Sequence, residues 1–209
     1  MFEIEYKGAG TVVISDKKNV VVTDPKLSLA GGKDVVIKDA VELATEERFA
    51  LNSSTAKLHI EGPGEYGFGD FDITGLAAQR HLDTENDPKI STMYRIEIGD
   101  ARVALLGNIY EKLSEEQLEE IGVIDTLIIP VGGGGYTLDA TGASSLVNQI
   151  DPKIVIPVHY ADSSLHYEVP QAELDEFVKQ LGAPVEDGGT KYKVKSLPDT
   201  LTVVKIARS

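Results

Sequence analysis

The stretch Asp125–Tyr160, DTLIIPVGGGGYTLDATGASSLVNQIDPKIVIPVHY, predicts a strand, a helix and a second strand. Thr126–Pro130 and Ile154–Val158 are apolar without polar alternation, which is typical of strands covered on both faces. A helix is expected between them, from about Asp139 to Gln149, with one apolar face. The unit is long enough for a right-handed parallel crossover. It brings His159 to the carboxyl end of a buried strand, where open α/β sheets usually place their chemistry.

Four glycines, Gly132–Gly135, follow the first of these strands and allow a sharp turn that side chains would forbid. The run lacks the spacing of a dinucleotide-binding fingerprint, and no Lys-Ser or Lys-Thr pair follows it. Its N–H groups and the start of the next helix leave anion binding open as an alternative.

Length and composition indicate one globular domain spanning residues 1–209. The net charge is 20 − 34 = −14, spread along the chain, so neither nucleic acid nor an anionic membrane is expected as a partner. The chain has no cysteine, which excludes disulfides, thiolate metal ligands and a cysteine nucleophile. No signal peptide or membrane span is indicated, and the expected location is the cytoplasm.

The rest of the chain reads as strands and hairpins first, with helices concentrated in the second half. Lys38–Phe49 is rich in helix formers, Ser114 can cap a helix that ends at Gly122, and Pro170 favours the start of another helix. Further strands are expected at Phe2–Tyr6, Thr11–Ile14, Val20–Thr23, Asp34–Ile37, Lys57–Ile60, Phe71–Thr74, Thr92–Ile98, Ala101–Leu106 and Thr200–Ile206.

Several blocks, in this order, resemble the metallo-β-lactamase fold superfamily. They are Val22-Thr23-Asp24-Pro25, Glu61–Tyr66, Arg95–Asn108 followed by Leu113–Gly122, and Thr126–Tyr160. Together they cover about the first 160 residues. The chain is similar in particular to a small bacterial branch of zinc-dependent hydrolases, akin to lactonase-like ascorbate-6-phosphate enzymes. The resemblance implies an α+β fold, a four-layer αββα sandwich with a metal site at one edge of its two sheets.

Active members of that superfamily carry a His-x-His-x-Asp-His loop, a third histidine after a later strand, a bridging aspartate after a Leu-Gly step, and a last histidine. Imidazoles and a bridging carboxylate hold two metals, which activate a water and polarise a carbonyl or phosphoryl group.

This sequence departs from that pattern. Lys38–Leu43, expected at the metal loop, contains no histidine, and Asn108 stands where the bridging aspartate belongs. His81, in the polar loop Leu76–Lys89, and His159 match the remaining two histidine positions. The resemblance therefore implies residual metal positions at His81, His159 and Asn108, with Asp24 supporting the metal loop from beneath.

Acidic side chains offer a substitute for the lost histidines. Asp39, Glu42 and Glu46, beside Glu47, lie in the right region and suit a hard cation such as Mg²⁺ or Ca²⁺. The alternative is an acidic helix face that is only solvated. His59 and His166 have no motif around them and are expected to be structural or exposed. No residue is assigned as catalytic.

Two functional hypotheses follow. The first is a non-catalytic binding or scaffolding member that has lost its metal loop, holds no cofactor and could self-associate. The alternative is a metal-dependent hydrolase with an altered or mononuclear site that uses His81 and His159 and takes zinc or another divalent metal. Whether the chain is an enzyme, and its substrate, are left open.

Overall fold

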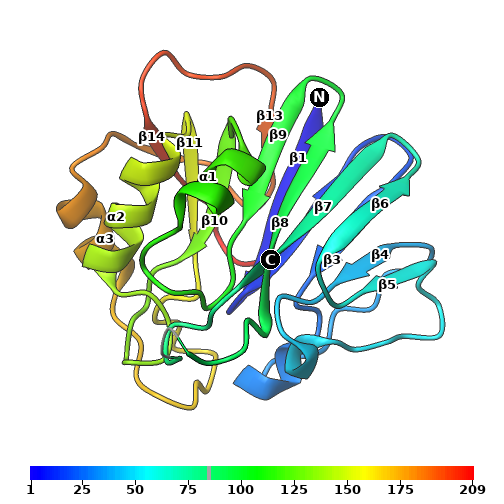
Figure 1. Cartoon of the computed structure of the whole chain (residues 1–209), viewed down its shortest axis with the longest axis horizontal. Helices are drawn as coiled ribbons and strands as arrows, with labels where there is room; N and C mark the ends of the chain where they lie inside the picture. The colour runs from blue at the N-terminus through cyan, green and yellow to red at the C-terminus, as the bar shows by residue number, and fades with distance from the viewer. Residues whose placement is uncertain (84–85) are drawn as a thin grey trace.

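The computed structural model describes residues 1–83 and 86–209 and contains two β-sheets (Figure 1). One sheet has six strands in the order β13-β1-β2-β3-β4-β5. Its strands are β1 (Phe2–Gly8), β2 (Thr11–Ser15), β3 (Val20–Thr23), β4 (Val41–Leu43), β5 (Leu58–Ile60) and β13 (Tyr192–Val194).

The other sheet has eight strands in the order β12-β14-β11-β10-β9-β8-β7-β6. Its strands are β6 (Gly64–Phe68), β7 (Phe71–Ala78), β8 (Ser91–Ile98), β9 (Ala101–Leu105), β10 (Thr126–Pro130), β11 (Ile154–Val158), β12 (Val185–Asp187) and β14 (Thr202–Lys205). Strands β6 to β9 are antiparallel, whereas β9, β10, β11 and β14 run parallel to one another.

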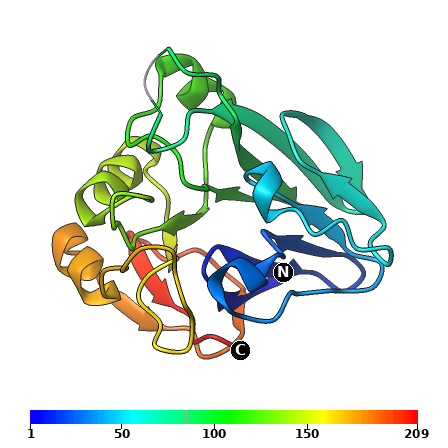
Figure 2. The same ribbon diagram turned by 90° about the horizontal axis from the view of Figure 1, so that it is seen from below.

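The main core lies between the sheets, where aliphatic and aromatic side chains from both sheets form one cluster that includes Ile4 and Val41 of one sheet and Ile96 and Ile156 of the other. A second core lies between the eight-stranded sheet and three helices: α1 (Glu115–Ile121), α2 (Ala140–Ile150) and α3 (Leu174–Leu181). The helices lie together on the side of that sheet away from the six-stranded one (Figures 1 and 2). This is the expected α+β sandwich of metallo-β-lactamase type.

The outer face of the six-stranded sheet has a different cover. The irregular segment through Val35 and Ile37 packs on Val13 and Val22 of this sheet. Leu27 and Ala30 of η1 (Leu27–Ala30), a short 3₁₀ helix, pack with Ala9 and Leu165 in a separate small cluster. None of the helices in the described residues is long and apolar enough to cross a membrane.

The strand–helix–strand unit forms as predicted: β10 and β11 pair in parallel, with Thr126 opposite Ile154 and Pro130 opposite Val158. Asp139 caps α2 by accepting a hydrogen bond from the Gly142 N–H at 2.8 Å. The Asp139 carboxylate thus accepts from an N–H group at the start of α2 and brings a negative charge to that end of the helix. The structure therefore gives no support to an anion site there.

Helix α1 also begins as predicted. The Gln117 N–H donates to the Ser114 hydroxyl at 3.1 Å, and the Gln117 side chain accepts from the Ser114 N–H at 3.0 Å. This reciprocal pair is a capping box. Gly122 ends the helix, with its N–H donating to the Leu118 carbonyl.

Three local predictions are wrong. Asp34–Ile37 is not a strand, and Lys38–Phe49 is not a helix: β4 begins at Val41, and only the 3₁₀ turn η2 (Glu47–Phe49) is helical. Pairing with β3 and β5 in the sheet overrides the helical propensity of this segment. Helix α3 starts at Leu174 with Glu173 as its N-cap, because Pro170 stays in an irregular segment.

Two further differences concern the middle of the chain. Gly64–Tyr66, expected in a tight turn, belongs to edge strand β6. The predicted loop Leu76–Lys89 is shorter because β7 runs to Ala78, and residues 84–85 of that loop lie outside the described residues.

The topology brings the carboxyl ends of parallel strands from both sheets to one edge. β3 and β4 are parallel, so Asp24 and the segment after Leu43 emerge together. β9, β10 and β11 are parallel, so Gly107, Gly132 and His159 emerge beside one another. Parallel strand ends are where α/β sheets form ligand sites.

Candidate functional site

A pocket with a cavity volume of about 50 Å³ lies at this edge. Its walls include apolar side chains such as Leu27, Leu29 and Val169. Its polar side chains come from both sheets and from the loops above them: Asp24, Lys26, Arg48, Asn108, Tyr136, His159, Tyr167, Glu168 and Gln171. A concave, largely apolar site with a few convergent polar groups is the usual form of a small-molecule site.

Asp24 anchors the loop after β4. Its carboxylate accepts the Thr45 N–H at 2.7 Å and the Thr45 hydroxyl at 2.8 Å, while its own N–H donates to the Leu43 carbonyl at 2.8 Å. Burial raises the pKa of Asp24 to about 7; the hydrogen bonds from Thr45 oppose this, and the nearby Glu46 carboxylate adds to it. Asp24 therefore lies beneath the loop, as the resemblance implied, and its supporting role stays a prediction.

The same loop is fixed from the other sheet. The Thr45 carbonyl accepts hydrogen bonds from the Thr92 N–H at 2.8 Å and the Ser91 hydroxyl at 3.2 Å. Gly107 lies directly against it: a Cβ at that position would come within 2.6 Å of the Thr45 Cβ. The absence of a side chain at Gly107 is what lets the two sheets close on this loop.

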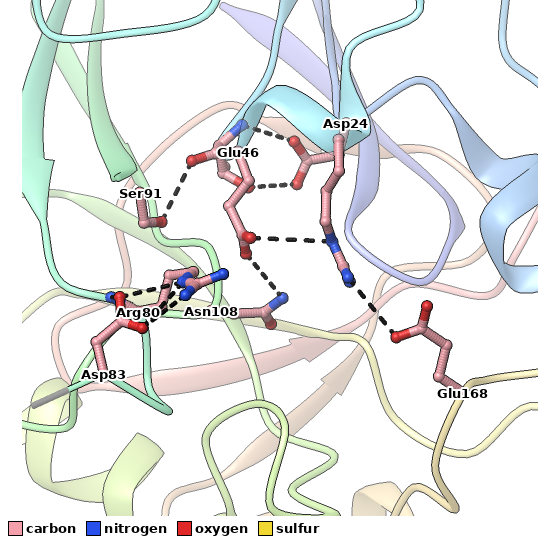
Figure 3. A network of polar contacts seen from close by, with 9 residues as sticks. Asp24, Glu46, Arg80, Asp83, Ser91, Asn108 and Glu168 are labelled. Carbon is pink, nitrogen blue, oxygen red and sulfur yellow. Dashed lines mark hydrogen bonds and ion pairs between the residues drawn. The ribbon is translucent and has the colours of Figure 1, made fainter. Parts of the chain in front are cut away.

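Glu46 and Arg48 form the charged centre of the site, and Figure 3 shows Glu46 beside Asn108. The Arg48 Nε lies 3.8 Å from a carboxylate oxygen of Glu46, and its Nη1 lies 3.6 Å from Glu168. The Asn108 amide donates to the other Glu46 oxygen at 3.4 Å. Burial raises the pKa of Glu46, and the positive charge of Arg48 with the Asn108 hydrogen bond limits the rise.

His159 enters the pocket from the end of β11. Its φ is 52°, and its N–H donates to the Ala9 carbonyl at 2.8 Å, so a contact with the other sheet holds this uncommon backbone conformation. The His159 Nδ1 lies 3.1 Å from the Gln171 Oε1, and its ring packs on Tyr167 with centroids 5.1 Å apart. Burial lowers the pKa of His159, so the imidazole is neutral at pH 7.

The structure thus groups His159, Asn108 and Asp24 around one pocket. Glu46 contacts Arg48, which also lines the pocket. His81 is not among the residues that line it. The His81 N–H donates to the Asn108 carbonyl at 2.9 Å, and its Nδ1 is buried without a described partner.

The other candidates lie elsewhere. Asp39 is exposed in a turn. Glu42 points to the outer side of β4, where its Oε2 lies 3.0 Å from His59 Nδ1 and 3.1 Å from the Ser53 N–H. His166 is exposed, as expected. Only Glu46 of the proposed replacement acids reaches the site, and it does so from a loop rather than from the helix face that was predicted.

Six polar residues of the pocket were missed by sequence reasoning: Lys26, Arg48, Tyr136, Tyr167, Glu168 and Gln171. Arg48 follows the acidic pair Glu46-Glu47, which indicates carboxylate ligands for a metal rather than a cationic site. Tyr136 comes at the end of the glycine turn, and Gln171 follows Pro170 in an irregular segment. No local signal marks either one, because both reach the pocket through long loops.

The donors present do not fit the two-metal centre that the fold implies. Within residues 1–83 and 86–209, no group of three His, Asp or Glu side chains is arranged to hold a metal ion. Both Asp24 oxygens accept hydrogen bonds from Thr45, and Glu46 faces a guanidinium and an amide N–H. A cation at the centre of the site also opposes the approach of a divalent metal.

Comparisons with known proteins identify relatives. The chain is 41% identical to a UPF0173 protein of Pyrococcus abyssi over 112 residues, which is 53% of this chain and 49% of that protein. It is 26% identical to a UPF0173 metal-dependent hydrolase of Carboxydothermus hydrogenoformans over 114 residues, 52% of this chain and 49% of that one. The chain therefore spans about half the length of these curated relatives.

Solved structures agree with the fold. A crystal structure from Thermotoga maritima, described as a zinc-dependent hydrolase of the metallo-β-lactamase superfamily, superposes with a TM-score of 0.80 at 25% identity over 100% of both chains. The Ignicoccus hospitalis metallo hydrolase Igni18 superposes with a TM-score of 0.67 at 16% identity, over 99% of this chain and 95% of that one, and shows the fold alone.

These comparisons overturn the prediction of a non-catalytic binding or scaffolding protein, because similar proteins are described as metal-dependent hydrolases. They favour the alternative, a metal-dependent hydrolase with an altered or mononuclear site. A family model for the beta-lactamase superfamily domain matches residues 3–159, which is well over half of the sequence. This chain belongs to the beta-lactamase superfamily.

Proposed function

We propose that this chain is a hydrolase that works in the pocket beside His159, with a site altered from that of its relatives. The names of those relatives support hydrolysis as the reaction class. The observation that carries the proposal is the His159–Gln171 contact, because it sets up a basic nitrogen in a partly apolar pocket.

The contact fixes which imidazole nitrogen carries the proton. The Gln171 amide N–H donates to the Val169 carbonyl at 3.0 Å, which turns Oε1 toward His159 Nδ1 at 3.1 Å. An amide oxygen only accepts, so Nδ1 must be the protonated nitrogen. Nε2 then has the free lone pair, and Gln171 acts as a positioning residue.

A neutral imidazole with a free Nε2 suits general-base catalysis. In an ester hydrolysis, a water molecule would donate a proton to His159 Nε2 while its oxygen bonds to the acyl carbon. The carbon–oxygen bond to the leaving group then breaks, and the same proton passes to the departing oxygen. No step here is assigned to a metal, because the described donors do not fit one.

The test is turnover of a small panel: p-nitrophenyl acetate, p-nitrophenyl phosphate, bis(p-nitrophenyl) phosphate and γ-butyrolactone. The His159→Gln variant should lower kcat by about 100-fold or more with a small change in KM, since general bases contribute about that much. His166→Gln is the matched control, because His166 is exposed. Wild-type turnover by His159→Gln, or no turnover of any substrate by the wild type, would overturn the proposal.

The remaining expectations are also proposals. The acidic chain without cysteine supports a cytoplasmic location and partners other than nucleic acid or membrane. Self-association is open to a measurement of mass in solution by light scattering. A fold of one domain over residues 1–209 is supported by the core shared between both sheets.

A further inference from the structure

Arg48 lies in the segment that follows β4. The metal loop was predicted at Lys38–Leu43, after a strand at Asp34–Ile37, and that placement is wrong: the strand is β4 (Val41–Leu43), so the segment after it is Ala44–Phe49. Arg48 lies in η2, directly after the loop that follows β4 and that Asp24 anchors. In this chain that segment, Ala44–Phe49, contains acids and one arginine but no histidine. Arginine carries a permanent positive charge and five N–H donors in a planar fork.

The surroundings of Arg48 hold its guanidinium in place. Its carbon Cζ lies 4.5 Å from the ring centre of Phe49 and 4.7 Å from that of Tyr136, so two aromatic rings contact the cation. Glu46 and Glu168 lie 3.8 and 3.6 Å away, close enough to attract the charge. These residues come from loops of both sheets, and together they fix the position of one cation at the pocket.

The N–H groups of the Arg48 guanidinium are nevertheless available to a ligand. Both ion pairs are longer than a hydrogen bond, and within the described residues the Arg48 side chain makes no hydrogen bond. Its Nε is buried without a hydrogen bond, although it lies 3.8 Å from a Glu46 carboxylate oxygen. A buried donor without a hydrogen bond is costly, so a ligand oxygen that accepts from Nε would be bound favourably.

The pocket beside it restricts what such a ligand can be. Arg48 is on the wall together with Leu27, Leu29 and Val169, and the cavity volume is about 50 Å³. An oxyanion attached to a short apolar group would satisfy both the fork and the apolar wall. Carboxylates match the guanidinium fork in geometry, and charge-assisted hydrogen bonds of this kind are strong.

We propose that Arg48 supplies the fixed positive charge that a metal supplies in related hydrolases, and that it binds an oxyanion of a small substrate or product without a metal ion. The catalytic part of this inference rests on the proposed hydrolase function, whereas the binding part and the metal content stand without it. This would explain why the residues present do not fit a two-metal centre. The Arg48 guanidinium, beside the carboxylates of Glu46 and Glu168, would supply the positive charge in place of the metal ions.

The test has two readouts that do not depend on turnover. The first is elemental analysis of wild-type protein purified without chelator, for which we expect less than about 0.1 equivalent of zinc, manganese, iron or nickel. The second is a ¹H–¹⁵N NMR titration with sodium acetate and, separately, with inorganic phosphate. Arg48→Gln should weaken binding of the better probe about 10- to 100-fold, the range expected for losing a charge-assisted hydrogen bond.

Two further variants make the result interpretable. Arg48→Lys keeps the charge but loses the fork, and should bind with intermediate affinity; it also serves if Arg48→Gln does not fold. Arg102→Gln is the matched control, because Arg102 is exposed near the start of β9, at the opposite end of that strand from the pocket. It should bind like the wild type.

Near-stoichiometric metal in the wild type that is lost in His159→Ala would overturn the inference, because the pocket would then be a metal site. Equal oxyanion binding by wild type, Arg48→Gln and Arg48→Lys would also overturn it. If the panel shows no turnover but the protein is metal-free and binds the probe through Arg48, the proposed hydrolase function fails and this inference holds.

Discussion

Replacing Asp24 by asparagine tests the electrostatics beneath the site. Burial raises the pKa of this carboxyl from 3.8 to about 7, although Thr45 donates two hydrogen bonds to it. A folded-state pKa above the unfolded one means that the group favours folding when it is protonated. Its contribution is fully present below about pH 4 and is lost as the pH rises through 7.

The size of the effect follows from the shift. The difference 7 − 3.8 = 3.2 pKa units corresponds to about 4 kcal/mol of unfolding free energy, lost between pH 4 and pH 8 in the wild type. Asp24→Asn cannot ionise, so its stability lacks this loss. The variant also loses hydrogen bonding to Thr45, an offset of about 1 to 3 kcal/mol that does not depend on pH.

Urea denaturation of both proteins at pH 4, 5, 6, 7 and 8 measures the difference directly, because the other titrating groups are shared. Asp16→Asn is a control of opposite sign: burial raises the pKa of Asp16, but hydrogen bonds from the N–H groups of Lys18 and Asn19 lower it overall. That contribution is present at neutral pH and lost as the pH falls. Parallel stability curves for wild type and Asp24→Asn across pH 4–8 would refute the reasoning.

Three other substitutions test contacts around the site and the fold. Gly107→Ala should destabilise the protein by about 1 to 3 kcal/mol in urea denaturation, because its Cβ would meet Thr45 at 2.6 Å. Ser114→Ala should cost about 1 kcal/mol in the same assay by removing half of the capping box, while Ser164→Ala, in an exposed loop, should cost less. Gln171→Leu should lower kcat on any panel substrate that the wild type turns over by about 10-fold or more, because His159 Nδ1 loses its acceptor, and the loss should show in the pH–rate profile; an unchanged profile would exclude Gln171 as a positioning residue.

Local sequence signals predicted the structure correctly where the stabilising interactions lie within one short segment. The β10–α2–β11 unit and the capped helix α1 formed as predicted, since apolar runs, a cap and a terminating glycine all act within about ten residues. The helix predicted at Lys38–Phe49 is wrong because a non-local interaction decides the structure of this segment. Its helical propensity is local, but pairing of β4 with β3 and β5 is not, and the sheet decided the outcome.

The superfamily, the two-sheet sandwich and the absence of the histidine loop follow from the amino-acid order alone, because they depend on the order of patterns and on which residue types are present. What stands in place of that loop depends on how distant segments come together in three dimensions. Arg48, Tyr136 and Gln171 come from three separate segments, and no spacing in the chain relates them. They meet because parallel strands of both sheets end at one edge, and a site assembled from loops at such an edge is encoded in the packing of the sheets.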